Sequence, residues 1–468
     1  MGEPFPAVFN MELAYQRGHT LARTGGFGIC YNPAVLIAKT TRNPVPQPSQ
    51  RIQRIPFSPI RAMFRLADEM ERAGRGPVIR FHVGDPDFPP PEPVIEATHR
   101  AMRQGRTHYP PSVGVHELRI ALAEKVTKRN AIAGSVEHIT VTPGSTEALL
   151  AVMELALHPG DDILLPEIYW PNYVQQALLV SARPVFYPLG AGYQPDVEGV
   201  RRAVTPRTRA ILINSPSNPT GAVFPEATLR ALYDIARERD LWVISDEAYE
   251  DIVFDAKQVS AASFERELPE KERRVFSLYT FSKSYAMTGF RLGYIVAPTL
   301  ETALILRKTQ EPLVGSTASM IQWGGMAALQ DDAPIAAMRA AYRRRRDLAV
   351  SMLRPPGLLD YTPEGAFYVL ADVSSTGMTG DEFARALLEE ERVAVAPASG
   401  FALAPEFGPD GHPRGEMTPA GAPDYPVNPK GRDHVRIAFC VSDQELSEGL
   451  SRMVRFAERK RPAATAKA

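Results

Sequence analysis

The stretch Ser277-Leu-Tyr-Thr-Phe-Ser-Lys-Ser-Tyr-Ala-Met-Thr-Gly-Phe-Arg-Leu-Gly293 surrounds one lysine, Lys283, with hydroxyl side chains. It also places Arg291 eight residues after that lysine. A lysine by itself is most often a solvated surface residue, so this stretch alone assigns it no role. Residues 275–279 before it are mostly apolar and predict a strand. Whether Lys283 carries a function therefore depends on the motifs elsewhere in the chain.

Short apolar segments separated by helical patterns lead up to and include this stretch. The predicted strands are 137–142, 162–165, 183–187, 209–214, 241–246, 275–279 and 291–296. Such alternation predicts an α/β fold whose mostly parallel, seven-stranded sheet lies between helices. Helices over 58–73, 333–354 and 443–458, with strands near 366–370, 392–396 and 434–438, predict a smaller α+β domain.

We predict three parts in the chain. Residues 1–50, with a Pro-rich exit, form an N-terminal arm or extension. Residues 51–90 and 335–468 form the small domain, and residues 91–334 form the large one. A long Pro- and Gly-rich segment, 403–433, interrupts the small domain; it is either a lid that specialises a nearby pocket or a surface insertion without function.

Composition narrows the class of protein. The chain has 468 residues, 44% hydrophobic and 23% charged, with a formal net charge of −1. This balance gives no electrostatic reason to expect nucleic acid or an anionic membrane as a partner. Its two cysteines suggest neither a disulfide framework nor a metal site. Without a predicted signal or membrane span, we expect a cytoplasmic protein that acts on small molecules.

The motif Thr142-Pro-Gly-Ser-Thr-Glu-Ala-Leu149 puts a turn of small residues between a predicted strand and a helix that begins near Ser145. Amides and hydroxyls at a helix N-terminus suit a phosphate group. Ordinary helix capping has the same appearance, so this motif is weak evidence when taken alone.

Two further motifs end predicted strands. Asn214-Ser-Pro-Ser-Asn-Pro-Thr-Gly221 is a rigid loop at the carboxyl end of a strand, where α/β proteins bind ligands. Val243-Ile-Ser-Asp-Glu-Ala-Tyr249 sends Asp246 out of a buried strand. An ionised carboxylate in such a position needs a cationic partner.

These motifs, in this order and at this spacing, resemble those of the class I/II aminotransferases, which are fold type I enzymes that use pyridoxal 5′-phosphate (PLP). The resemblance extends from about Ser58 to the final helix. It implies that the chain moves an amino group between an L-amino acid and a 2-oxo acid through a Schiff base on Lys283 and pyridoxamine phosphate.

The resemblance also implies roles for single residues. Lys283 would hold the cofactor and move the proton, and Asp246 would keep the pyridine nitrogen protonated. Asn218 and Tyr249 would form hydrogen bonds with the ring oxygen. The implied phosphate ligands are Ser145, Thr146, Thr280, Ser282 and Arg291, with Trp170 stacked on the ring.

Further matches concern the substrate and a second subunit. Arg436, with the backbone of Gly84 and with Asn218, would bind the α-carboxylate of the amino acid. Tyr109 is similar to the tyrosine that reaches the phosphate of the neighbouring subunit, which implies a homodimer with shared active sites. The resemblance implies no metal ion.

The sequence departs from the branch of the family that uses acidic substrates. That branch can carry a lysine where this chain has Thr146, and Ile60 lies in a stretch that lines the side-chain pocket in relatives. Both residues favour a substrate with a neutral or apolar side chain. A cation supplied from elsewhere, such as Arg51, Arg54 or Arg414, would reverse that expectation.

Two other functions stay open at this point. A PLP-dependent lyase, decarboxylase, oxidase or bond-forming enzyme of specialised metabolism would use the same fold and cofactor. A PLP-sensing transcription regulator is disfavoured, because the first fifty residues are too short and too weakly periodic for a DNA-binding domain.

Overall fold

The computed structural model describes residue 46 and residues 48–418 and 421–462. The predicted N-terminal arm therefore lies almost wholly outside the described residues. No helix in the described part of the chain combines the length and the hydrophobicity needed to cross a bilayer.

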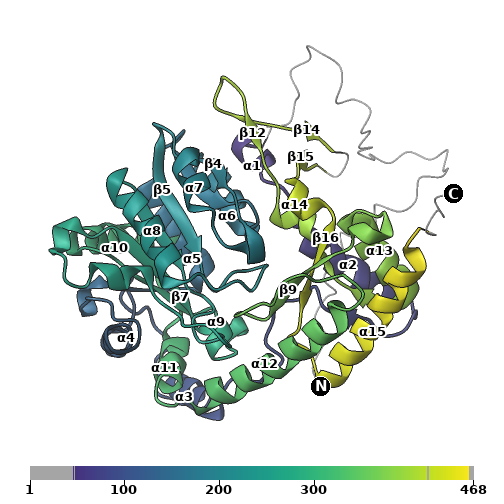
Figure 1. The fold of residues 1–468 in the computed structure, drawn as a ribbon. Coiled ribbons are helices and arrows are strands. Elements are labelled where there is room, and N and C mark those ends of the chain that lie inside the picture. The colour runs from purple at the N-terminus through teal and green to yellow at the C-terminus, as the bar shows by residue number, and fades with distance from the viewer. Residues whose placement is uncertain (1–45, 47, 419–420, 463–468) are drawn as a thin grey trace, which may run out of the picture. The chain divides into compact units, whose positions relative to one another are not determined.

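A seven-stranded sheet forms the centre of the fold, in the order β2-β8-β7-β6-β5-β3-β4 (Figure 1). All neighbouring pairs are parallel except those of β8, which runs antiparallel to β2 and β7. The strands are β2 (Ile139–Thr142), β3 (Asp162–Pro166), β4 (Arg183–Tyr187), β5 (Thr208–Asn214), β6 (Trp242–Asp246), β7 (Val275–Thr280) and β8 (Gly293–Val296). The predicted fold class, a mostly parallel seven-stranded sheet between helices, is confirmed.

Alternate residues of each central strand face opposite sides of this sheet. In β5, Ile211 and Ile213 enter one apolar cluster, whereas Ala210 and Leu212 enter another. A strand that is apolar at successive positions therefore needs helices on both faces. The first cluster is covered by α4 (His116–Arg129), α8 (Glu226–Glu238) and α11 (Ser319–Ala328), and the second by α5 (Ser145–Ala156), α6 (Asn172–Leu179) and α10 (Leu300–Val314).

A second, antiparallel sheet has the strand order β11-β16-β9. Its strands are β9 (Tyr368–Asp372), β11 (Ala396–Pro397) and β16 (His434–Ala438), and β1 (Ile79–Arg80) pairs separately with β10 (Val393–Ala394). A third apolar cluster joins this sheet to α2 (Pro59–Arg72), α12 (Ala333–Leu353), α13 (Gly380–Glu391) and α15 (Asp443–Lys460). The other helices are α1 (Gln50–Gln53), α3 (Glu92–Arg103), α7 (Val197–Ala203), α9 (Phe281–Ser284) and α14 (Pro429–Arg432).

Most predicted elements begin and end within two residues of the observed ones. Three strands begin two residues late, those predicted over 137–142, 291–296 and 366–370. The strand predicted near 392–396 is two strands, β10 and β11, which pair with different partners. The strand predicted over 137–142 starts late because Val136–His138 form a short 3₁₀ helix, whose N-terminus is capped by the Ser135 side chain. The strand predicted over 291–296 starts late because Arg291 has a φ of 54°, in the left-handed region, which interrupts an extended chain.

Residues 403–433 form two short hairpins and a helical turn. The hairpins pair β12 (Glu406–Phe407) with β13 (Pro413–Arg414) and β14 (Glu416–Met417) with β15 (Pro423–Asp424). The Tyr169 hydroxyl donates to the Leu403 carbonyl at 2.5 Å, and the Lys430 ammonium pairs with Glu167 at 2.5 Å. The insertion is thus attached to the segment that follows β3.

Candidate cofactor site

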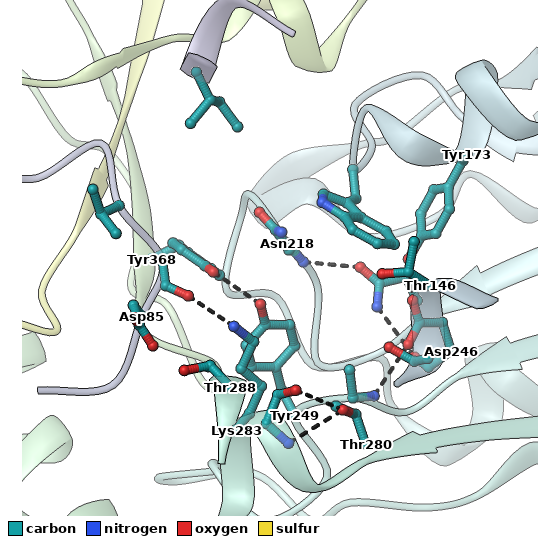
Figure 2. A pocket seen from close by; sticks show the side chains of 18 of the residues that line it. Asp85, Thr146, Tyr173, Asn218, Asp246, Tyr249, Thr280, Lys283, Thr288 and Tyr368 are labelled. Carbon is teal, nitrogen blue, oxygen red and sulfur yellow. Dashed lines mark hydrogen bonds between the residues drawn. The ribbon is translucent and has the colours of Figure 1, made fainter. Parts of the chain in front are cut away.

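A cavity of about 340 Å³ lies where the carboxyl ends of the central strands face β9 and β16 (Figure 2). Twelve of the thirteen residues to which the sequence assigned a cofactor, catalytic or substrate role line it. They are Gly84, Ser145, Thr146, Trp170, Asn218, Asp246, Tyr249, Thr280, Ser282, Lys283, Arg291 and Arg436. Parallel strands end at one edge of a sheet, which is why motifs far apart in the chain meet here.

Lys283 lies in α9, directly after β7, and points into this cavity. Its ammonium donates to the Gly84 carbonyl at 2.7 Å. Burial lowers the pKa of Lys283 to about 8, and nearby Cys440 and Asp85 oppose part of that effect. A lowered pKa leaves more of the amine neutral and nucleophilic near neutral pH.

Asp246 ends β6 and is almost completely buried. It accepts hydrogen bonds from the Tyr173 hydroxyl at 2.6 Å and from the Ala248 amide at 3.2 Å. Burial nevertheless raises the pKa of Asp246, because no ion pair links this carboxylate to a described cationic side chain. A cationic group in the cavity would reverse that effect and keep the carboxylate ionised.

Arg436, on β16, is 2% exposed and forms a wall of the cavity. It donates to Asn218 Oδ1 at 3.1 Å and to the His82 carbonyl at 2.6 Å. Its Nε has no hydrogen-bond partner among the described residues. The Tyr249 hydroxyl hydrogen-bonds that of Tyr368 at 2.8 Å.

The opposite end of the cavity suits an anion. Ser145 and Thr146 begin α5, and Thr280 and Ser282 flank the start of α9. Gly144 has a φ of 84°, and a side chain there would meet the Arg291 guanidinium at 2.8 Å. Helix-terminal amides, hydroxyls and an arginine together are a phosphate-binding set.

Tyr109 alone among the predicted site residues does not line this cavity, and its side chain is 97% exposed. Sequence reasoning in turn assigned no role to Tyr173 or Tyr368, which contact Asp246 and Tyr249. Tyr173 was visible only as an aromatic near Trp170, because nothing in the linear spacing connects α6 with β6. Tyr368 comes from a strand of the second sheet.

One of the two hypotheses for residues 403–433 was a lid that specialises this cavity. No described residue of 403–433 lines it. Arg54 and Arg414 line a different cavity, together with Asp410, Asp424 and other residues of the hairpins. Neither arginine therefore supplies a cation to the pocket that contains Lys283.

The residues of the cavity fit PLP. The anion-binding end suits its phosphate, the buried carboxylate of Asp246 suits a pyridinium nitrogen, and Lys283 suits its aldehyde. Together with the sheet order, this set defines a PLP-dependent enzyme of fold type I. The family model for aminotransferases of class I and II matches residues 76–425. The chain belongs to this family, and it is a PLP-dependent aminotransferase.

Individual relatives support the assignment. The "Probable aspartate/prephenate aminotransferase" of Aquifex aeolicus is 37% identical over 420 residues, which are 88% of this chain and 98% of the relative. The "Aromatic-amino-acid aminotransferase 2" of Thermococcus litoralis is 32% identical, with 88% and 99% covered. The structure of Thermus thermophilus aspartate aminotransferase with maleate matches with a TM-score of 0.77 at 34% identity, with 88% and 100% covered.

The lowered pKa of Lys283 predicts how cofactor capture depends on pH. Only the neutral amine attacks an aldehyde, and its fraction rises until the pH passes the pKa. We expect the rate of covalent PLP capture by cofactor-free protein to increase about tenfold from pH 7 to pH 9, and to level off above pH 8. Stopped-flow absorbance would measure this rate, with a free primary amine in the same buffers as reference. A rate that still climbs steeply at pH 10 would contradict the prediction.

Proposed function

We propose that the cavity residues act in transamination in the roles that their contacts suggest. Bound PLP supplies an electron sink for the carbanion that forms when the substrate loses its Cα proton. Asp246 keeps the ring nitrogen protonated, and Asn218 and Tyr249 hydrogen-bond the ring oxygen. Ser145, Thr146, Thr280, Ser282 and Arg291 hold the phosphate, and Trp170 covers the ring face.

Lys283 is the proposed acid and base. Its amine lies at the end of a short helix beside the Gly84 carbonyl, so its position is fixed by a hydrogen bond. As a neutral amine, Lys283 would take the proton from the substrate Cα, and as the resulting ammonium it would hold that proton for its return. The single observation that carries this proposal is the meeting of Lys283, Asp246 and Arg436 in one cavity.

Arg436 is proposed to bind the substrate α-carboxylate, helped by the backbone of Gly84 and by Asn218. No salt bridge connects Arg436 to a described carboxylate, so its charge is uncompensated in the wall of the cavity. A bound carboxylate would satisfy the charge and the free Nε–H. Holding the carboxylate there orients the Cα–H bond toward Lys283.

We propose that the favoured amino acid has a neutral or apolar side chain. Apart from Lys283, Arg291 and Arg436, no lining residue of the cavity is a lysine or an arginine, and Ile60 and Thr146 are among the residues that line it. The names of the relatives include acidic and aromatic substrates. The second candidate, an acidic substrate, is favoured by Arg61, which lines an adjoining cavity of about 950 Å³ with Ile60 and Thr146.

Steady-state kinetics would separate these candidates. With pyruvate as amino acceptor, we expect kcat/KM for leucine or phenylalanine to exceed that for aspartate or glutamate by at least about tenfold, the discrimination typical of an apolar pocket. A preference for aspartate would overturn the proposal and would favour Arg61 as the residue that binds the second carboxylate of the substrate. Conversion of amino acids without release of the matching 2-oxo acid would argue against transamination altogether.

We further propose a cytoplasmic homodimer with shared active sites. Tyr109, next to Pro110 and Pro111, is almost fully exposed in the single chain. A large aromatic side chain left this exposed suits a contact with a second subunit. The proposed division into a large domain, 91–334, and a small domain, 51–90 with 335–468, is supported by the apolar cluster around the second sheet, most of whose members come from the small domain. A reducing compartment is consistent with Cys440, a buried free thiol.

A further inference from the structure

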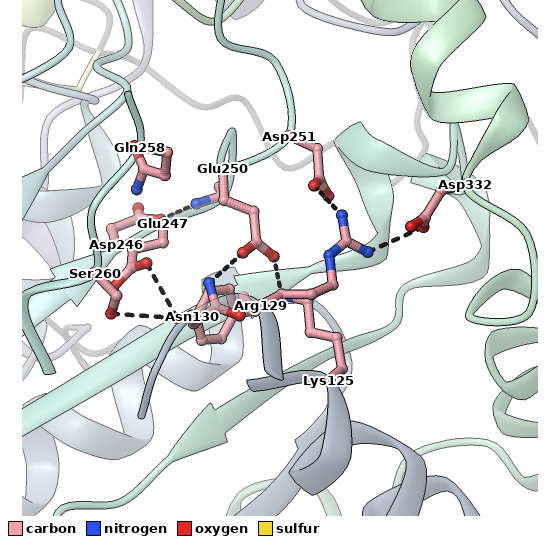
Figure 3. A network of polar contacts seen from close by, with 12 residues as sticks. Lys125, Arg129, Asn130, Asp246, Glu247, Glu250, Asp251, Gln258, Ser260 and Asp332 are labelled. Atoms are coloured by element: carbon pink, nitrogen blue, oxygen red, sulfur yellow. Dashed lines mark hydrogen bonds and ion pairs between the residues drawn. The ribbon is translucent and has the colours of Figure 1, made fainter. Parts of the chain in front are cut away.

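The turn after β6 presents its side chains to opposite sides. Asp246 and Tyr249 line the cofactor cavity, whereas Glu247 and Glu250 point away from it toward α4 and β7 (Figure 3). Glu247 is buried, the Glu250 side chain is only 11% exposed, and each carboxylate has a partner on a neighbouring element. The contacts on the far side of the turn thus add to those of Tyr173 and Tyr368 in holding the two cavity residues in place.

Lys125 of α4 makes the central contact on that far side. Its ammonium pairs with Glu250 Oε1, and the side chains of the pair are only 7% and 11% exposed. Asn130, just after the end of α4, donates to Glu250 Oε2 at 2.6 Å. Both oxygens of Glu250 are thus held by one helix and the residue that follows it.

Lys125 also contacts the strand that leads to Lys283. Its ammonium lies 4.4 Å from the centre of the Tyr279 ring, a cation–π arrangement. The Tyr279 hydroxyl donates to Glu247 Oε2 at 3.0 Å. Lys125 is therefore in contact with the turn that follows Asp246 and with β7, in which Thr280 comes directly after Tyr279.

A second ion pair reinforces the same connection one turn of helix further on. Arg129, four residues after Lys125, pairs with Asp251 at 2.6 Å and with Asp332 at 3.0 Å. The turn is thereby joined to the start of α12 as well. Its acidic residues are held from several directions, which leaves little freedom for Asp246.

A buried ion pair adds little to stability, because removing two charges from water offsets most of their attraction. Apolar side chains of similar size would fill the same space. The charged pair instead fixes the relative position of the two side chains, because a hydrogen bond is directional. The pair of Lys125 and Glu250 therefore serves mainly to position α4 and the turn after β6 relative to each other.

We propose that Lys125 is a positioning residue for the cofactor site, which holds the 246–250 turn against β7 so that Asp246 keeps a fixed position relative to Lys283. The inference rests on the proposed role of Asp246. Lys125 itself touches neither cofactor nor substrate, and it acts through Glu250 and Tyr279.

The test compares K125M with K128M, in which an exposed lysine of the same helix is replaced. In K125M we expect the dissociation constant for PLP to rise by about 10- to 100-fold and kcat to fall by a similar factor, with KM for the amino acid nearly unchanged. Hydrogen exchange of the cofactor-free protein should increase selectively within 246–251. K128M, whose lysine is 73% exposed, should match the wild type in all measurements.

The double variant K125M/E250Q separates positioning from mere stability, because it leaves no unpaired buried charge. We expect it to recover thermal stability but not PLP affinity. Recovery of both, an even increase of exchange over the whole chain, or wild-type affinity in K125M would each overturn the proposal. K283A, assayed alongside, distinguishes a failure of the proposed function from a failure of the positioning role. Retained activity in K283A would overturn the proposed function. An unaffected K125M would overturn only the positioning role of Lys125.

Discussion

Replacing Lys283 with alanine is expected to lower kcat for transamination by at least about 10⁴-fold, the upper end of what one acid–base group contributes. Lys283 is the only lysine among the described residues that line the cavity. Its loss removes both the amine that binds the cofactor covalently and the group that moves the proton. Continuous measurement of 2-oxo acid release gives kcat directly.

The K283A experiment needs a control and a readout other than activity. K257A replaces a lysine whose side chain is 83% exposed, and it should retain wild-type kcat. Borohydride treatment followed by peptide mass spectrometry should attach the cofactor mass to the Lys283 peptide in wild-type protein and to no peptide in K283A. Activity above about 1% of wild type in K283A would contradict the assignment, since it exceeds the expected residual activity by about two orders of magnitude.

Replacing Arg436 with alanine is expected to lower kcat/KM for amino acids by about 150- to 5,000-fold, because truncating one partner of a buried charge pair costs about 3 to 5 kcal/mol. The guanidinium is buried, holds Asn218 and the His82 carbonyl, and keeps one free donor. R436K keeps the charge but loses the planar fork, so its loss should be smaller.

The matched control for Arg436 is R432A, which replaces an exposed arginine four residues earlier. PLP affinity should be nearly the same in R436A, R432A and wild type, because Arg436 is proposed to bind substrate and not cofactor. A loss of less than tenfold in kcat/KM for R436A would contradict the carboxylate-binding role. Equal losses in R436A and R432A would indicate a general effect on the small sheet.

Much of the fold was predictable from local pattern. The seven strands of the large sheet are short apolar runs, so burial on both faces followed from composition alone. The resemblance to the class I/II aminotransferases predicted twelve of the lining residues. Several of them meet because parallel strands bring their carboxyl ends together. The errors were small and local, such as the late start of β8, where Arg291 adopts a left-handed conformation.

The 403–433 insertion shows where local pattern stops being informative. Its prolines and glycines predicted an irregular segment, and a lid was one of two hypotheses. Its tertiary contacts, such as those of Lys430 with Glu167 and of Tyr169 with Leu403, attach it to the segment that follows β3, and no described residue of it lines the cavity. Such contacts join residues more than two hundred positions apart, which no periodicity encodes.

The amino-acid sequence by itself determined the sheet, the cofactor class and the residues around Lys283, because each depends on short motifs, on the family they resemble and on the alternation of short apolar segments with helical patterns. The tertiary structure alone decided how those residues are held. Tyr173 against Asp246, Tyr368 against Tyr249 and Lys125 against Glu250 are contacts between separate elements. Their geometry depends on how helices pack on the sheet, and packing is a property of the whole folded chain.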